Sequence, residues 1–75
     1  MKTLYDLNVG EEAIIYDFNK SYALSLRLCE IGLIKGRNLR LIKKGPFGGP
    51  VQIKLNNNYI AIRKEDAKMI YIKRK

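Results

Sequence analysis

Short runs of β-type sequence recur at close spacing along this chain, and turn residues separate them. Residues 13–18 are rich in β-branched and aromatic side chains, and residues 51–55 alternate apolar with polar side chains, as expected of strands with one buried face. Between such runs lie the turn signals Asn8-Val9-Gly10, Gly45–Pro50 and Asn56–Asn58. This pattern predicts a mainly β fold, either a small barrel or a sandwich.

Further runs complete the predicted fold. We expect a single helical turn at Lys64–Met69, and strands at Thr3–Leu7, Asn38–Lys44, Tyr59–Arg63 and Ile70–Lys73. The order predicts an SH3-like barrel of about five strands, with one inserted helix and a short helical turn before the last strand. An OB-type five-stranded barrel is the nearest alternative. No linker divides the chain, so residues 1–75 are expected to form a single domain.

One segment has helical periodicity. Leu24, Leu28 and Ile31 share one face of a helix predicted over Tyr22–Ile31. Gly32 follows at the position where a helix often ends with a left-handed residue. We take this helix as the insertion in the barrel.

The residue inventory argues against catalysis and against a metal site. The chain has no histidine, and its one cysteine, Cys29, falls in the predicted helix, where we interpret it as a small buried apolar residue. The seven acidic residues form no carboxylate pair placed for acid–base work. We therefore predict that the protein is not an enzyme and has no cofactor.

The sequence shows neither a signal peptide nor an apolar run of the length that spans a bilayer. A single cysteine forms no internal disulfide, so a reducing, cytoplasmic setting fits best. We expect no direct membrane insertion.

The chain is strongly basic, with 15 Lys and Arg against 7 acidic residues and a net charge of +8. This balance favours an acidic partner such as nucleic acid, anionic lipid or an acidic protein surface. The charges are spread along the chain, however, so a compositional bias is the competing explanation.

A nucleic-acid surface would require basic and aromatic residues on one sheet face. The residues that would build it, if their strands are neighbours, are Arg40, Lys54, Tyr59 and Arg63. In the alternative interpretation the aromatic rings fill the barrel instead; these are the rings of Tyr5, Tyr16, Phe18 and Tyr59.

The loop at Gly45–Pro50 is rich in glycine but is not a phosphate-binding loop. It lacks the Gly-Lys-Ser/Thr ending, no helix follows it, and Pro46 and Pro50 remove N–H donors. It connects two strands, and it can also form a recognition surface. Phe47 at its tip is either tucked over the end of the barrel or presented to a partner.

Four motifs follow one another in a distinctive order. The opening is Leu4-x-x-Leu7-x-x-Gly10-x-x-Ala13-x-Ile15, and the helix with its turn is Leu26-Arg27-Leu28-x-Glu30-x-Gly32-Leu33-x-x-Gly36. The loop is Gly45-Pro46-x-Gly48-Gly49-Pro50-Val51, and the closing segment is Ala61-Ile62-Arg63-x-x-x-Ala67-x-x-Ile70-x-Ile72. This ordered set covers almost the whole chain and resembles the ferrous iron transport protein A family (FeoA). The chain departs from the family pattern at Leu26, Lys35 and Gly45, where arginine, proline and alanine are usual.

The resemblance implies a cytoplasmic accessory module of ferrous iron uptake. Its expected partner is the large membrane iron transporter, which carries a GTPase domain; the module would bind the transporter's cytosolic part and modulate its assembly or activity. It would then lie peripherally at the inner face of the membrane. The family is described as binding transition metals, but this sequence predicts no metal site of its own.

Two other interpretations stay open beside this one. A basic barrel that binds nucleic acid is the alternative function, and weak association into a homo-oligomer is compatible with either. The candidate partner-binding residues are Leu26, Arg27, Glu30, Pro46, Phe47 and Arg63.

Overall fold

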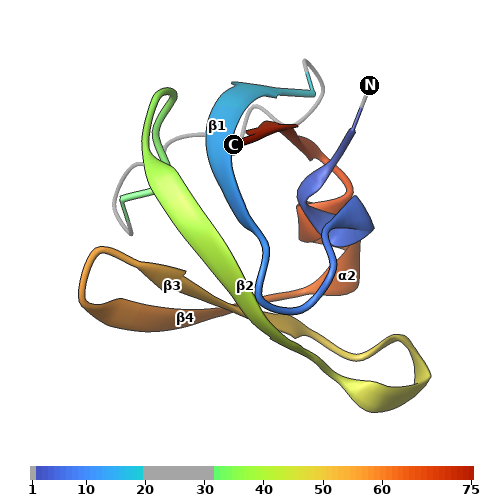
Figure 1. The fold of residues 1–75 in the computed structure, drawn as a ribbon. Coiled ribbons are helices and arrows are strands. Elements are labelled where there is room, and N and C mark those ends of the chain that lie inside the picture. The colour runs from blue at the N-terminus through green and yellow to red at the C-terminus, as the bar shows by residue number, and fades with distance from the viewer. Residues whose placement is uncertain (1, 20–31) are drawn as a thin grey trace.

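A computed structural model describes residues 2–19 and 32–75 (Figure 1). Within these ranges one antiparallel sheet of five strands forms, in the order β4-β3-β2-β1-β5. The strands are β1 (Glu12–Phe18), β2 (Asn38–Lys44), β3 (Val51–Leu55), β4 (Asn58–Ile62) and β5 (Ile70–Arg74). The predicted mainly β fold of about five strands is confirmed. The helix expected over Tyr22–Ile31 lies outside the described residues.

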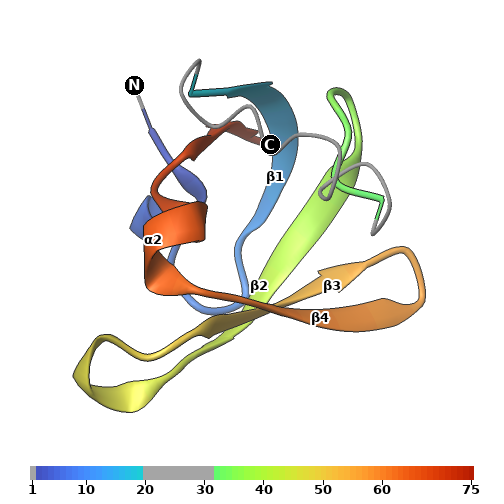
Figure 2. The same ribbon diagram turned by 180° about the vertical axis from the view of Figure 1, so that it is seen from behind.

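The sheet is strongly bent, and two short helical elements lie beside each other next to it (Figures 1 and 2). These elements are η1 (Leu4–Asp6), a single 3-10 turn, and α2 (Lys64–Ala67), which contacts η1. The helical turn expected at Lys64–Met69 is therefore confirmed, with its end two residues earlier. No helix in the described part of the chain is long and apolar enough to cross a bilayer.

The core lies on one face of the sheet, where the apolar positions of each strand alternate with outward-facing ones. On β3 the buried residues are Val51, Ile53 and Leu55, and between them Gln52 and Lys54 point outward. Such alternation follows from the two-residue period of a strand. Each fully buried leucine or isoleucine contributes about 1.5–3 kcal/mol of transfer free energy. Among the described residues, the buried core consists of Leu4, Leu7, Ala13, Ile15, Leu33, Leu39, Leu41, Val51, Ile53, Leu55, Ile62, Ala67, Ile70 and Ile72.

The prediction of a strand at Thr3–Leu7 was wrong, because this segment forms the 3-10 turn η1. Only Thr3 joins the sheet, through an isolated bridge to Tyr71. The Asp6 carboxylate accepts from the Thr3 backbone N–H at 2.9 Å and from its hydroxyl at 3.2 Å, and the Asp6 N–H donates to the Thr3 carbonyl at 2.9 Å. Short polar side chains that bond their own backbone compete with strand formation in this way. The turn also buries both Leu4 and Leu7, three residues apart.

The hairpin between β3 and β4 forms as the sequence predicts. Asn56 has φ 57°, the left-handed conformation that asparagine tolerates better than most residues. Pairing then begins at Leu55 with Asn58, so β4 starts one residue before the expected Tyr59 and ends at Ile62.

The four aromatic residues considered for the barrel interior divide into two pairs. Tyr5 and Phe18 pack against the core, partly buried. Tyr16 and Tyr59 are 44% and 59% exposed, because the strand register places them on the outer face. There the Nζ atom of Lys73 lies 4.4 Å from the centre of the Tyr16 ring.

Candidate docking surface

The loop between β2 and β3 holds Phe47 away from the rest of the molecule. It contains the short turn η2 (Pro46–Gly48) and is closed by two backbone hydrogen bonds, from the Gly45 N–H to the Pro50 carbonyl at 2.9 Å and from the Gly49 N–H to the Pro46 carbonyl at 3.0 Å. Phe47 itself has φ 55° and ψ 39°. Its side chain is fully exposed. Of the two positions considered for this ring, the structure shows the presented one.

In this conformation the closed loop has no room for a side chain at Gly45. A Cβ atom at Gly45 would lie 2.7 Å from the Pro50 carbonyl oxygen, far inside van der Waals contact. Because Gly45 has φ −66°, the requirement is for space and not for an unusual backbone conformation. The absence of this one carbon therefore lets the two ends of the loop approach.

An open groove of about 290 Å³ runs beside the loop on the outer face of the sheet. Pro46 and Pro50 form its wall at the loop, and Gln52 and Ala61 line it on β3 and β4. Lys43 adds a positive charge at its border. The predicted candidate Pro46 thus lines a hollow next to the exposed ring of Phe47.

Arg63 lies at the start of α2. Its Nε atom is 3.3 Å from the Asp66 carboxylate, three residues further along the chain, and its side chain is 69% exposed. The next residue, Lys64, reaches back to the loop, since a Cβ atom at Gly48 would lie 3.4 Å from its Nζ atom. The structure therefore brings the beginning of α2 close to the Phe47 loop. The remaining candidates, Leu26, Arg27 and Glu30, lie outside the described residues.

The face considered for nucleic acid is partly assembled. Arg40 pairs with Lys54, and Lys54 pairs with Tyr59, so the three residues form one row across β2, β3 and β4. Lys54 Nζ lies 5.9 Å from the centre of the Tyr59 ring. Arg63 does not join this row, because it follows β4 and lies at α2.

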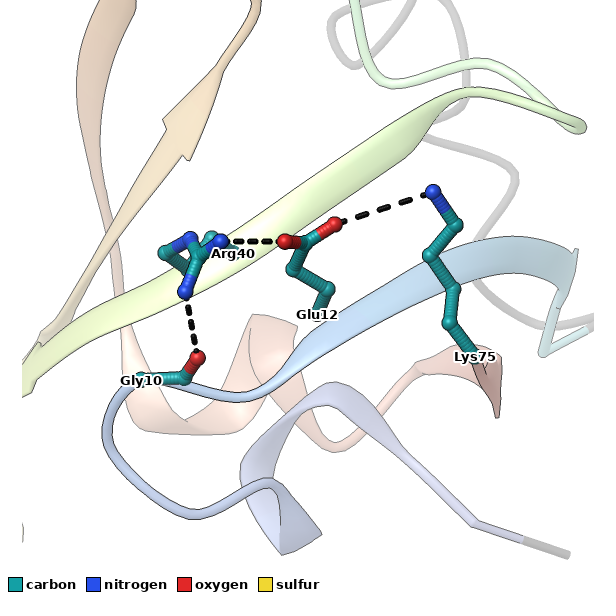
Figure 3. A network of polar contacts seen from close by, with 4 residues as sticks. All are labelled: Gly10, Glu12, Arg40 and Lys75. Atoms are coloured by element: carbon teal, nitrogen blue, oxygen red, sulfur yellow. Dashed lines mark hydrogen bonds and ion pairs between the residues drawn. The ribbon is translucent and has the colours of Figure 1, made fainter.

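The row ends in an ion-pair network on β1. Arg40 donates to the Glu12 carboxylate and, at 2.8 Å, to the Gly10 carbonyl (Figure 3). Lys75 Nζ lies 3.6 Å from the other Glu12 oxygen. The donors of the Arg40 guanidinium are thus directed to partners within the chain, which leaves Lys54 and Tyr59 as the more available part of the row.

A basic group that the sequence interpretation missed surrounds Tyr5. Lys44, Lys64 and Lys68 each place Nζ within 5.0–5.7 Å of the centre of the Tyr5 ring. Lys64 and Lys68 share one helical face at i, i+4 spacing, which is a signal the sequence contains. Their approach to Tyr5 and Lys44 depends on tertiary packing of η1 against α2, which the strand assigned to Thr3–Leu7 concealed.

The environment of Asp6 favours its ionised form. The hydrogen bond from the Thr3 backbone N–H, with smaller contributions from the Thr3 hydroxyl and the charges of Lys2 and Lys44, lowers the pKa of the Asp6 carboxyl below its ordinary value of 3.8. Partial burial opposes this effect. The carboxylate serves the local fold of η1, since it accepts its hydrogen bonds from Thr3.

The side chains described do not fit a metal centre. No three of the His, Cys, Asp and Glu residues within 2–19 and 32–75 gather closely enough to hold a metal ion. Glu11 and Glu12 are adjacent, but they form ion pairs with Arg74 and Arg40.

Comparison with known proteins places this arrangement in a family. The family model described as "FeoA domain" matches residues 2–74. A Campylobacter jejuni protein named "Putative Fe(2+) transport protein A" is 31% identical over 70 residues, which are 93% of this chain and 95% of that protein. A fusion of Fe(2+) transport protein A with Fe(2+) transporter FeoB from Porphyromonas gingivalis is 25% identical over 69 residues; the match covers 92% of this chain but only 8% of the fusion.

A solved structure supports the same assignment. Stenotrophomonas maltophilia FeoA, determined in complex with zinc and described as a prokaryotic SH3 domain protein, superposes with a TM-score of 0.81 at 27% identity. The match covers 97% of this chain and 91% of that one. The predicted SH3-like architecture is thereby confirmed. With the family model spanning nearly its full length, this chain belongs to the FeoA domain family.

Proposed function

We propose that this chain is a cytoplasmic accessory protein of ferrous iron transport, which binds the cytosolic part of the membrane iron transporter and modulates its assembly or activity. The family membership supports the transport process, and the Porphyromonas gingivalis fusion supports the choice of partner, because one polypeptide there joins the two components. In this proposal the chain acts by binding and has no catalytic role. It lies at the inner face of the membrane through its partner.

The observation that carries the docking proposal is the exposed ring of Phe47 on a closed loop. Two backbone hydrogen bonds and two flanking prolines limit the motion of the loop, so little conformational freedom is lost when a partner covers the ring. Aromatic side chains seated in a partner pocket are typical energetic centres of interfaces. The groove beside Pro46 gives the partner an adjoining hollow.

Arg63 is the proposed polar contact at the border of this surface. Its pairing with Asp66 uses Nε, and the side chain is largely exposed, so the terminal guanidinium nitrogens stay accessible to a partner carboxylate. Leu26, Arg27 and Glu30 remain proposed contacts on the strength of the sequence motif.

The test is affinity capture from detergent-solubilised cells with this protein as bait. Each sample is divided and one half is treated with nuclease. We expect the membrane transporter in both halves. Phe47→Ala should weaken capture by more than about 1 kcal/mol, a loss typical of a central interface residue. Tyr59→Ala is the matched control, because it removes another exposed aromatic ring from the outer face of β4.

Two results would count against the proposal. Equal capture by wild type and Phe47→Ala would remove the loop from the interface. Recovery of only nuclease-sensitive, RNA-associated proteins would favour the nucleic-acid alternative, which the row of Arg40, Lys54 and Tyr59 supports. In that case Lys54→Gln should reduce binding and Phe47→Ala should not.

A further inference from the structure

Three ammonium groups converge on Tyr5, and none of them forms an ion pair in the described part of the chain. The Nζ atoms of Lys44, Lys64 and Lys68 lie 5.0, 5.6 and 5.7 Å from the centre of the Tyr5 ring. We call these three residues the Tyr5 lysine cluster. Lys44 comes from the end of β2 and the other two from α2 and its C-terminal boundary, so the fold and not the local sequence assembles them.

The cluster is not neutralised within the described ranges. Five other basic residues there form ion pairs, namely Lys35, Arg40, Arg63, Arg74 and Lys75. None of the three cluster lysines does. The nearby acid Asp6 is influenced by the charge of Lys44, but its hydrogen bonds go to Thr3. Like charges held together gain most from an anionic partner, because that partner removes their mutual repulsion.

The composition of the cluster indicates which kind of anion it suits. It contains lysines only, and these act as flexible point charges without the bidentate fork that arginine offers to a carboxylate or a base edge. Tyr5 is packed against the core on one side and approached by the ammonium groups, so its ring is not a platform on which a nucleobase stacks. A surface of many mobile anionic groups is the better match.

The position of the cluster favours a lipid surface in particular. Lys64 adjoins Gly48, the residue next to the fully exposed Phe47. Basic residues attracted by an anionic leaflet, beside an apolar side chain that enters the boundary between headgroups and acyl chains, are typical of surfaces that bind membranes peripherally. We propose that the Tyr5 lysine cluster binds the anionic headgroups of a lipid bilayer. This contact is peripheral, inserts no segment of the chain, and does not require the transporter.

The experiment uses protein-free vesicles, so its result is independent of the docking proposed above. One set contains phosphatidylcholine alone, and the other contains equal parts of phosphatidylcholine and phosphatidylglycerol. Co-sedimentation of the intact protein is measured at low and at raised salt. We expect binding to the anionic vesicles only, and binding that weakens as salt screens the charges.

A charge-matched pair of variants locates the contact. The triple variant K44Q/K64Q/K68Q removes the cluster and should lose binding on the order of a hundredfold, at roughly fivefold for each lysine near an anionic surface. The control K54Q/K73Q/K75Q lowers the net charge equally, from +8 to +5. Two of its lysines also lie over tyrosine rings, Lys54 over Tyr59 and Lys73 over Tyr16. It should lose less than about fivefold. A third variant, K44R/K64R/K68R, should bind as wild type does.

The two glutamine variants distinguish binding through the cluster from binding through net charge. Equal losses in the two glutamine variants would overturn the proposal, because net charge and not the cluster would then drive binding. Absence of binding to anionic vesicles would overturn it as well. The proposal would also be overturned if a duplex DNA fragment bound wild type but not K44Q/K64Q/K68Q while the anionic vesicles bound neither. Circular dichroism of each variant shows whether the exchanged side chains leave the fold unchanged.

Discussion

The backbone N–H of Gly45 donates to the carbonyl of Pro50 at 2.9 Å, and these two residues approach so closely that a Cβ atom on Gly45 would lie 2.7 Å from the same oxygen. In this conformation the loop that presents Phe47 therefore leaves no room for a Cβ atom at Gly45, although alanine is usual at this position in the family. We predict that Gly45→Ala destabilises the protein by about 1–3 kcal/mol, the usual range when an atom is forced into filled space. Urea unfolding followed by circular dichroism measures this change.

A comparison with Gly36→Ala separates two causes of strain. Gly36 has φ 87° and open space where a Cβ would stand, so alanine there is strained by its backbone alone, by about 1–2 kcal/mol. NMR spectra should show shifted Phe47 resonances in Gly45→Ala and unchanged ones in Gly36→Ala. Unchanged Phe47 resonances in both variants would mean that Gly45 does not set the loop.

The strand pattern of the sequence predicted the central sheet well. Leu39 and Leu41 on β2, and Val51, Ile53 and Leu55 on β3, are buried as their alternation indicates. This succeeds because a strand's two faces depend only on a period of two, which the sequence displays directly. The Asn-rich hairpin was also predictable, since its conformation is local.

The candidate site was less predictable, because it depends on distant pairings and on one backbone angle. Nothing local to Phe47 specifies φ 55°, the conformation of the loop tip from which its ring is fully exposed. The row of Arg40, Lys54 and Tyr59 requires the register of three strands. Tyr5 was assigned to a strand, although local hydrogen bonds between Thr3 and Asp6 form a turn there and bring Tyr5 beside α2.

Ile53 belongs to the core and is fully buried on β3. We predict that Ile53→Val lowers the free energy of unfolding by about 0.5–1.5 kcal/mol and that Ile53→Ala lowers it by about 2–5 kcal/mol, because the cavity grows with each carbon removed. Chemical denaturation measures both. Ile34→Ala is the control, since that side chain is 37% exposed. A loss at Ile34 as large as that at Ile53 would contradict the assigned core.

The stability of η1 should depend on pH through Asp6. Its pKa is lowered in the folded state, chiefly by the hydrogen bond from the Thr3 N–H, so the folded chain holds this proton less tightly than the unfolded chain. The stabilisation is therefore present above the ordinary value of 3.8 and is lost as pH falls through the lower folded value. As the pH is lowered below 3.8, the urea midpoint should decline less steeply for Asp6→Asn than for wild type. If Asp6→Asn and wild type lost stability in parallel as the pH falls, the hydrogen bonds to Thr3 would not contribute to folding.

The pairing of Glu12 with Arg40 joins β1 to β2 at the point where the two residues are also in register. Both side chains are about half exposed, at 40% and 46%, so we predict a coupling free energy of only about 0.2–1 kcal/mol. A double-mutant cycle with Glu12→Gln and Arg40→Gln, evaluated by urea unfolding, measures it.

The coupling should decrease at raised salt, because exposed charges are screened. It should also decrease in a Lys75→Gln background if Lys75 helps to hold the Glu12 carboxylate in place, as their 3.6 Å separation indicates. A coupling of zero at low salt would show that this ion pair does not help to set the register of β1 and β2. The register would then depend on the backbone hydrogen bonds between the strands and on Ala13 and Leu39, which are buried opposite each other.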